Sequence, residues 1–269
     1  MSKEKQKMLR ILRDSGLITL ADTIRYYFYV LKYYRKTRLF CARNPGFKVP
    51  PRFLAFDAYS APDWDFYKIS GSETATFLSS IAKRYLPENT SLRVLEWGCG
   101  PARVIRHISS NFGSGAEVYG SDYNRDTISW CTQNIRGVIF SLNELRPPLP
   151  FNDRVFDFIY SISVFTHLSE SVCHEWVKEL YRIMRSGAIA VISTDGDRSL
   201  KRLLPDELET YQTRGVVVRG RVLEGKKLFF AAHSPAYVRE CLFKSFEVME
   251  FASGKFPYTG QDIWILRKP

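Results

Sequence analysis

The sequence predicts an α/β fold, in which helices cover both faces of an open and mostly parallel β-sheet. A short apolar run ends in Glu96, a glycine-rich turn follows, and a helical pattern begins at Val104. Further short apolar runs alternate with helical patterns along the rest of the chain. Acidic residues stand where the first two runs end, and open α/β sheets bind their ligands at the carboxyl ends of their strands. The order of elements therefore predicts both the fold and the edge of the sheet that holds its site.

The individual elements follow from the same patterns. Expected strands lie at 94–96, 117–121, 138–140, 156–160, 189–194, 246–251 and 262–266. The fifth of these begins with a continuous apolar run, 189–192, which is typical of a strand buried on both faces. Helices are expected at 73–86 and 169–185, and the prolines of 41–66 predict a connecting segment. Residues 198–232 depart from this alternation with a helical pattern and two β-rich runs, which predict an inserted hairpin.

The first fifty residues differ from the rest in charge. Residues 1–50 contain 12 Lys and Arg against 3 Asp and Glu, whereas residues 51–269 contain 27 against 25. An apolar stripe with helical spacing runs from Leu17 to Leu31. This helix either docks on an anionic membrane or a protein partner, or packs on its own domain as a lid or a contact between copies. The second interpretation is favoured, because most apolar stripes belong to a core. We therefore expect a basic amphipathic extension (1–50) and one domain (51–269), and a homo-oligomer stays open.

Composition argues against several kinds of site. The five cysteines form no C-x-x-C pair, which indicates a reduced setting and disfavours zinc. Asp195 and Asp197 follow the fifth strand, but two acids without a third ligand are typical of a solvated turn, so no metal is expected. No apolar run reaches the length of a membrane-spanning helix. The near balance of charge in 51–269 disfavours a nucleic-acid enzyme, whose cleft is usually basic.

The glycine-rich turn distinguishes two classes of cofactor. A dinucleotide-binding turn has the pattern G-x-G-x-x-G, but Arg103 stands at the third position, after Gly98 and Gly100. The carboxylate of Glu96 would also repel a pyrophosphate, whereas it would attract an amino group. The stretch 96–100 resembles motif I, E/D-x-G-x-G, of the class I methyltransferases that depend on S-adenosylmethionine (SAM).

That resemblance extends over about residues 67–269, by the order of motifs. It implies a Rossmann-like, seven-stranded sheet with an antiparallel last strand, and SAM as the cofactor. Glu96 would hold the amino group of SAM, and Gly98 and Gly100 would let the backbone approach it closely. Asp122 ends the second strand just over twenty residues after the turn, where a carboxylate accepts ribose hydroxyls. The other expected contacts are Tyr67 and Gly71 at the methionine end, Tyr123 and Asn143 at the adenine, and Ser161 after the fourth strand. On burial preference alone, Tyr67 is equally a core aromatic.

The segment after the fourth strand is where the methyl group would point in this family. It lacks the D/N-P-P-Y/F motif of amino-methylating nucleic-acid enzymes and the Pro-Cys nucleophile of cytosine-C5 enzymes. It contains His167 instead, a side chain that accepts protons near neutral pH. The alternative is that His167 only caps or packs against the next helix. His233, just before a helix cap at Ser234, is a second candidate base.

Together these features predict a SAM-dependent methyltransferase that acts on a hydroxyl of a sugar, glycan or small metabolite. An in-line displacement with a histidine as the base is expected, and residues 198–232 would shape the acceptor side. Two alternatives stay open: a nucleic-acid (RNA) methyltransferase anchored by the basic N-terminus, and a non-catalytic scaffold or regulatory subunit. We expect a cytoplasmic protein, peripheral at the membrane if residues 1–50 dock there.

Overall fold

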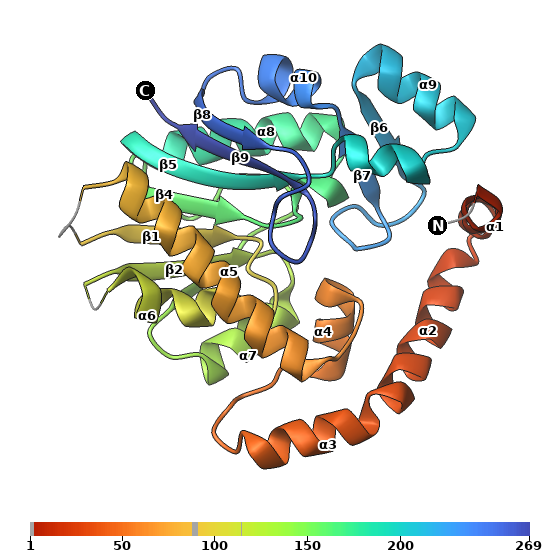
Figure 1. Ribbon diagram of the computed structural model, residues 1–269, viewed down its shortest axis with the longest axis horizontal. Coiled ribbons are helices and arrows are strands. Elements are labelled where there is room, and N and C mark those ends of the chain that lie inside the picture. The colour runs from red at the N-terminus through yellow and green to blue at the C-terminus, as the bar shows by residue number, and fades with distance from the viewer. Residues whose placement is uncertain (1–2, 88–90, 114) are drawn as a thin grey trace. The chain divides into compact units, whose positions relative to one another are not determined.

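The computed structural model describes residues 3–87, 91–113 and 115–269. Its strands are β1 (Arg93–Trp97), β2 (Glu117–Asp122), β3 (Ile139–Leu142), β4 (Phe156–Ser161), β5 (Met184–Thr194), β6 (Val216–Arg219), β7 (Phe230–His233), β8 (Glu247–Ala252) and β9 (Asp262–Arg267). Seven of them form one sheet in the order β3-β2-β1-β4-β5-β9-β8, and β6 and β7 form a second sheet (Figure 1). The pairs β1–β2, β2–β3 and β4–β5 are parallel, whereas β9 is antiparallel to β5 and β8. The predicted mostly parallel, seven-stranded sheet with an antiparallel last strand is confirmed.

The helices divide between two compact units. They are α1 (Lys3–Asp14), α2 (Ile18–Lys32), α3 (Tyr34–Arg43), α4 (Arg52–Tyr59), α5 (Trp64–Tyr85), α6 (Ile108–Phe112), α7 (Arg125–Asn134), α8 (Glu170–Ile183), α9 (Pro205–Arg214), α10 (Pro235–Tyr237) and the short turns η1 (Ile105–His107), η2 (Phe165–His167), η3 (Asp197–Arg202) and η4 (Val238–Leu242). Residues 22–144 form one unit, here called the glycine-loop unit, and residues 1–21 with 145–269 form the other, the insertion unit. The division into 1–50 and 51–269 stays a prediction.

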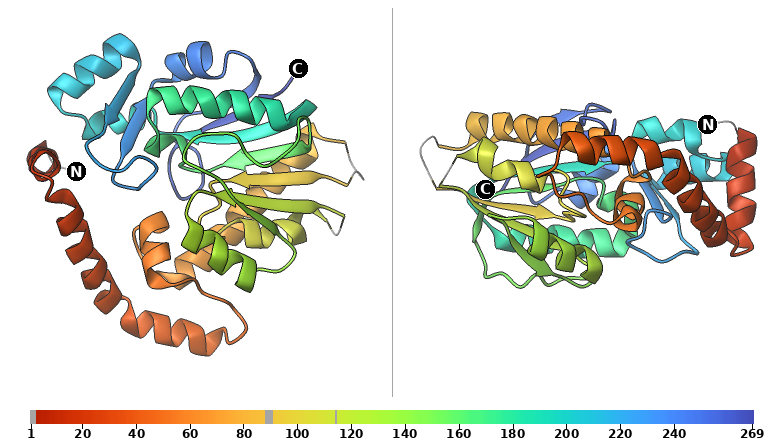
Figure 2. Two further views of the ribbon diagram at one scale, coloured as in Figure 1. Left: turned by 180° about the vertical axis from the view of Figure 1, so that it is seen from behind. Right: turned by 90° about the horizontal axis from the view of Figure 1, so that it is seen from below.

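In the glycine-loop unit, α5 and α6 pack together on one face of β1–β3 (Figure 2). Two predictions for this unit are wrong. The segment 41–66 contains the helix α4, whose Leu54, Ala55 and Phe56 are buried. The next helix begins at Trp64 rather than at residue 73, because the side chain of Asp63 caps it by accepting the backbone N–H of Phe66 at 3.3 Å.

In the insertion unit, α8 buries one face against the strands, and most of β5 is buried. Residues 188–194 are all buried, as predicted for a strand covered on both faces. The expected hairpin is also confirmed, since β6 and β7 pair in antiparallel register from Val216 opposite His233 to Arg219 opposite Phe230. Its core is separate and contains Leu203, Tyr211, Val217 and Ala232.

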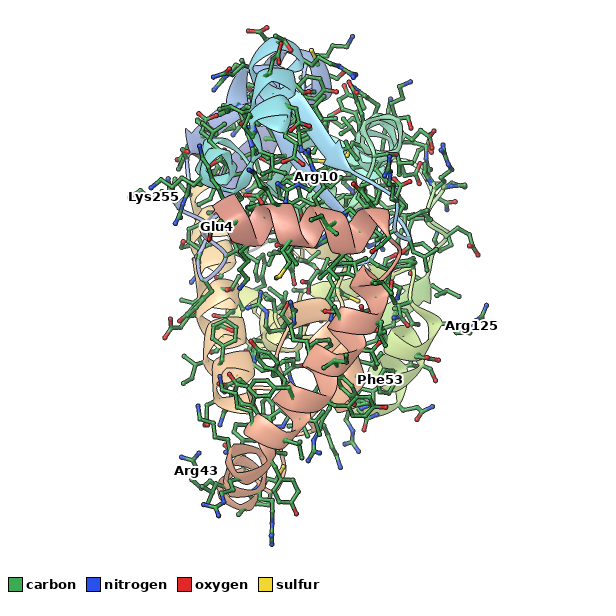
Figure 3. All side chains as sticks on the ribbon, turned by 90° about the vertical axis from the view of Figure 1, so that its right-hand side faces the viewer. Glu4, Arg10, Arg43, Phe53, Arg125 and Lys255 are labelled. Carbon is green, nitrogen blue, oxygen red and sulfur yellow. The ribbon has the colours of Figure 1, made fainter. Side chains whose placement is uncertain are left out.

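The helix α1 belongs to the insertion unit through polar contacts. The guanidinium of Arg10, a side chain labelled on α1 in Figure 3, donates to both carboxylate oxygens of Asp206 at 3.1 and 2.9 Å. Arg13 donates to the carbonyl oxygen of Arg219 at 2.9 Å, and Arg219 donates to the side-chain oxygen of Gln6 at 3.2 Å. These contacts hold α1 against α9 and β6, next to the inserted hairpin.

Candidate active site

The glycine loop, residues 98–102, follows β1 and binds back to β2. Gly98 and Gly100 have φ values of 78° and 49°, in the left-handed region that glycine adopts without strain. The N–H groups of Gly98 and Cys99 donate to the carbonyl of Ser121 at 2.8 and 3.0 Å. Ala102 donates to the carbonyl of Gly100 at 2.8 Å, and the N–H of Gly100 donates to the carboxylate of Asp122 at 2.9 Å. Every N–H of the loop therefore has a partner within this unit.

The internal hydrogen bonds of the glycine loop distinguish between a dinucleotide and a ligand that carries an amino group. A loop that binds a pyrophosphate offers its backbone N–H groups to the phosphate oxygens. Here those groups are used internally, and Glu96, at the end of β1, is only 3% exposed. A buried carboxylate favours a cationic or N–H-donating neighbour. The loop thus suits a ligand that carries an amino group near Glu96 better than it suits a dinucleotide.

Asp122 joins the glycine loop to the start of α7. One carboxylate oxygen accepts the N–H of Gly100, and the other accepts the N–H of Asn124 at 2.8 Å. A carboxylate has about four acceptor positions, so these two bonds leave a contact with ribose hydroxyls chemically open. Tyr123 comes next and is half-buried. Contacts of both residues with the cofactor stay predictions.

Asn143 links the ends of β2 and β3. Its side-chain oxygen accepts the hydroxyl of Ser121, and its amide nitrogen donates to the carbonyl of Glu144 at 2.6 Å. These two bonds fix the orientation of the amide, with its oxygen toward Ser121 and its nitrogen toward the carbonyl of Glu144. An amide oxygen has two lone pairs, so the predicted contact with the adenine amino group is compatible with this orientation.

Tyr67 and Gly71 lie on α5 and support the glycine loop. The hydroxyl of Tyr67 donates to the carbonyl of Pro101 at 2.6 Å, and the side chain is 2% exposed. Burial raises the pKa of Tyr67 well above the usual value, so its hydroxyl stays protonated and a donor. A Cβ on Gly71 would lie 2.0 Å from the carbonyl oxygen of Arg103. Close packing thus explains both residue types, and the predicted contacts with the methionine end of SAM stay predictions.

Three further residues, whose role the sequence did not predict, also hold this loop: Tyr59, Arg103 and Arg106. A Cβ on Gly100 would lie 3.2 Å from the hydroxyl of Tyr59. Arg103 donates to the hydroxyl of Ser70 at 3.1 Å with its guanidinium 5.4 Å from the Tyr59 ring centre, and Arg106 donates to the hydroxyl of Tyr67 at 3.2 Å. The helix α4, which ends at Tyr59, could have been predicted, because Pro51 stands directly before its apolar helical pattern and a proline there is typical of a helix start.

In the insertion unit, His167 is held by the inserted segment. Its Nδ1 lies 2.8 Å from the carbonyl oxygen of Phe229, and its own carbonyl accepts the N–H of Gly225 at 2.8 Å. Because a carbonyl only accepts, Nδ1 carries the proton and Nε2 is the basic nitrogen of the neutral ring. The fold therefore sets the tautomer of this half-buried histidine.

Ser161 and His233 are enclosed more tightly. Ser161 ends β4, is fully buried, and its hydroxyl has no hydrogen-bond partner among the described residues. His233 is 0% exposed, its Nε2 lies 3.9 Å from the thiol of Cys173, and burial lowers its pKa to about 4. A fully enclosed ring has no surface for an acceptor, so of the two candidate bases only His167 is carried forward.

The acidic residues after β5 have protein partners. Asp195 forms an ion pair with Arg202, and Asp197 accepts the hydroxyl of Tyr211 at 2.9 Å. Over the described ranges, no group of three or more His, Cys, Asp and Glu side chains is arranged to hold a metal ion.

Comparisons with known proteins agree with this geometry. Residues 94–187 match a family model described as a methyltransferase domain. The malonyl-[acyl-carrier protein] O-methyltransferase of Bacillus anthracis is 27% identical over 131 residues, which cover 48% of this chain and 46% of that protein. The chain thus matches about half the length of this curated relative.

Two solved structures share the fold at low identity. A SAM-dependent methyltransferase from Methanosarcina mazei is 19% identical, with a TM-score of 0.54 over 70% of this chain and 96% of that chain. The 1,6-didemethyltoxoflavin N1-methyltransferase of Burkholderia thailandensis, solved with S-adenosylhomocysteine, is 12% identical, with a TM-score of 0.52 over 74% and 80%. The matched domain, the sheet order and the glycine loop agree, so residues 94–187 form a methyltransferase domain with the fold of the class I SAM-dependent enzymes, and SAM is the cofactor that this family implies.

Proposed function

We propose that this methyltransferase is an O-methyltransferase, in which His167 removes the proton from an acceptor hydroxyl. The observation that carries the proposal is the bond between Nδ1 of His167 and the carbonyl of Phe229, which leaves Nε2 as the proton acceptor. The curated relative in Bacillus anthracis is itself named an O-methyltransferase, which supports oxygen as the atom methylated.

The residues expected to hold the cofactor come mainly from the glycine-loop unit. Glu96 would bind the amino group, Asp122 the ribose and Asn143 the adenine, with Tyr123 against the adenine ring. Gly98 and Gly100 would admit the cofactor close to the backbone, while Tyr67 and Gly71 keep the loop in place and Ser161 adds a hydroxyl from β4. When bound, SAM supplies a methyl carbon made electrophilic by the adjacent sulfonium.

The acceptor needs a base because a neutral hydroxyl is a weak nucleophile. Neutral imidazole takes the proton from the hydroxyl oxygen, and the bond from Nδ1 to Phe229 stabilises the imidazolium that forms. The inserted segment holds His167 through Gly225 and Phe229, so this segment also sets the place of the acceptor oxygen. A hydroxyl of a sugar, glycan or small metabolite is the proposed acceptor.

Replacing His167 by glutamine tests the proposal. We expect His167→Gln to lower kcat by about 100-fold or more, the usual contribution of a general base, while SAM affinity measured by calorimetry stays unchanged. The assay follows methyl label from SAM into fractions of a cell extract, and mass spectrometry identifies the product. His174→Gln is the matched control, since His174 lies outside the site and binds the hydroxyl of Tyr237.

The same variant separates two kinds of acceptor. A carboxylate is already ionised at neutral pH and needs no base, so a carboxyl-methylating enzyme would keep its activity in His167→Gln. Full activity of this variant would therefore refute both the role of His167 and the hydroxyl acceptor.

A further inference from the structure

The helix α2 presents its apolar face to solvent. With Leu17 in the turn just before the helix, its outward stripe consists of six side chains that are 50–76% exposed: Leu17, Leu20, Ile24, Tyr27, Phe28 and Leu31. At 100° per residue these positions share one side of the helix. The opposite side is the one that packs, since the rings of Tyr26 and Tyr29 lie 5.3 and 6.0 Å from the ring of Phe56 on α4. An exposed apolar surface of this extent marks an interaction site.

The surface continues beyond α2. Phe53 on α4 and Tyr34 at the start of α3 are each 49% exposed, and Phe53 lies near α2 in Figure 3. Packing within the molecule, the interpretation favoured by the sequence alone, leaves this stripe uncovered. It takes no part in the site described above.

The segment around the stripe is predominantly basic. Residues 23–50 contain seven Lys and Arg and no Asp or Glu. Arg25 pairs with Asp22 at 3.6 Å, Lys36 with Asp63 at 3.5 Å and Arg43 with Asp65 at 3.2 Å, so the segment keeps a net positive charge after these three ion pairs. In contrast to Arg10 and Arg13 of α1, which bind the inserted segment, Arg35 and Arg38 are exposed on α3. An apolar face flanked by cations and rich in tyrosine is typical of a helix that lies in a membrane interface.

We propose that α2 and the start of α3 bind an anionic membrane surface. The apolar stripe enters the boundary between headgroups and acyl chains, and the basic residues contact anionic headgroups. A second copy of the chain is a poorer occupant, because residues 23–50 of each copy keep a net positive charge after their three ion pairs, so two such segments would repel each other. Among the described helices none is long and apolar enough to cross a membrane, so the helix would lie in the plane of the surface.

Vesicle cosedimentation of the full chain tests this proposal. We expect binding to phosphatidylcholine vesicles that contain phosphatidylglycerol, and little binding to phosphatidylcholine alone. The variant L20S/I24S/F28S should weaken the partition coefficient at least about 100-fold, because three large apolar side chains no longer enter the interface. The variant R35Q/R38Q should weaken it about 30-fold, at about 1 kcal/mol for each cation.

The matched control replaces exposed apolar residues outside the segment. Ile139 and Leu223 are 57% and 76% exposed, and I139S/L223S should bind vesicles like the unmodified chain. SAM calorimetry checks that each variant is folded. It also measures cofactor binding, which belongs to the proposed function, independently of vesicle binding. If L20S/I24S/F28S does not fold, R35Q/R38Q decides.

Three results would overturn the proposal. The first is failure of the unmodified chain to bind phosphatidylglycerol vesicles at low salt. The second is equal binding by the variants and the unmodified chain. The third is a dimer in light scattering that L20S/I24S/F28S dissociates, without vesicle binding, since the stripe would then be a contact between copies.

Discussion

The two units of the molecule hold their candidate site residues in different ways. In the glycine-loop unit, backbone bonds fix the site, as where Asp122 accepts the N–H groups of Gly100 and Asn124. In the insertion unit, the candidate base His167 depends on the inserted segment, through Phe229 and Gly225. The first arrangement suits a ligand common to a whole family, and the second suits an acceptor that differs among its members.

The two units should differ in how freely their sequences can change. Any chain that binds SAM at a glycine loop must keep the short strand, the left-handed turn and the acidic residue, because these are requirements of the backbone. An inserted segment with its own small core can change without disturbing them. The acceptor is therefore expected to depend on residues 198–232 more than on the sheet.

A matched pair of glycine variants, one in each unit, should give the largest difference in stability and SAM binding between the two units. A Cβ at Gly71 would lie 2.0 Å from a backbone oxygen, that of Arg103, whereas a Cβ at Gly196 would meet the side-chain oxygen Oδ2 of Asp262 at the same distance. We expect Gly71→Ala to lower the free energy of unfolding by about 3 kcal/mol and to weaken SAM binding at least tenfold. Gly196→Ala should cost about 1 kcal/mol, because a side chain moves more easily than backbone, and should leave SAM binding unchanged.

Denaturant titration and calorimetry measure these two effects. Ser72→Ala, an exposed neighbour of Gly71 on α5, is the control for substitution in that helix. If Gly71→Ala bound SAM normally, the glycine loop would not depend on its packing against α5.

A smaller effect is expected in the insertion unit, where the protonation of His233 makes the free energy of unfolding depend on pH. Burial lowers the pKa of His233 from 6.5 to about 4, so the unfolded chain binds this proton more readily than the folded chain does. Stability is therefore lost as pH falls from about 6.5 to about 4, and the loss from this residue is about 2 kcal/mol at pH 5. His233→Phe, which does not titrate, should lose less stability than the unmodified chain between pH 8 and pH 5.

Denaturant titrations at the two pH values provide the measurement. His107, in the glycine-loop unit, also has a pKa lowered to about 4, by burial and by Arg106, and its contribution remains in the variant. Equal losses in the two proteins would mean that His233 is not held neutral in the folded state.

The sequence predicted the sheet well because each strand is a short apolar run with a polar end. Glu96, Gly98, Gly100 and Asp122 were recognisable for the same reason, since the turn requires those residue types at that spacing. The start of α5 was predicted too late, because the prolines of 41–66 indicated a connecting segment and Gly71 was assigned to the cofactor rather than to a helix. Its absent side chain instead lets α5 approach the carbonyl of Arg103, which is a contact over 32 positions that no local pattern reveals.

The candidate bases show a second limit of sequence reasoning. His167 and His233 had similar standing in the sequence, since each lies close to the end of a strand and the start of a helix. Burial separates them, because His233 is fully enclosed while His167 is half-buried and oriented by Phe229. The outward face of α2 was likewise visible as a stripe, but its exposure depends on which side meets Phe56.

Calorimetric titration of SAM into the full chain tests the central claim most directly. We predict one binding site per chain, with affinity weakened about 100-fold in Asp122→Ala, because hydrogen bonds to a buried carboxylate are strong and the glycine loop loses its anchor. Asp126→Ala, which removes an exposed acid four residues later on α7, should bind like the unmodified chain. Equal affinity of Asp122→Ala and the unmodified chain would contradict the assignment of the glycine loop as the SAM site.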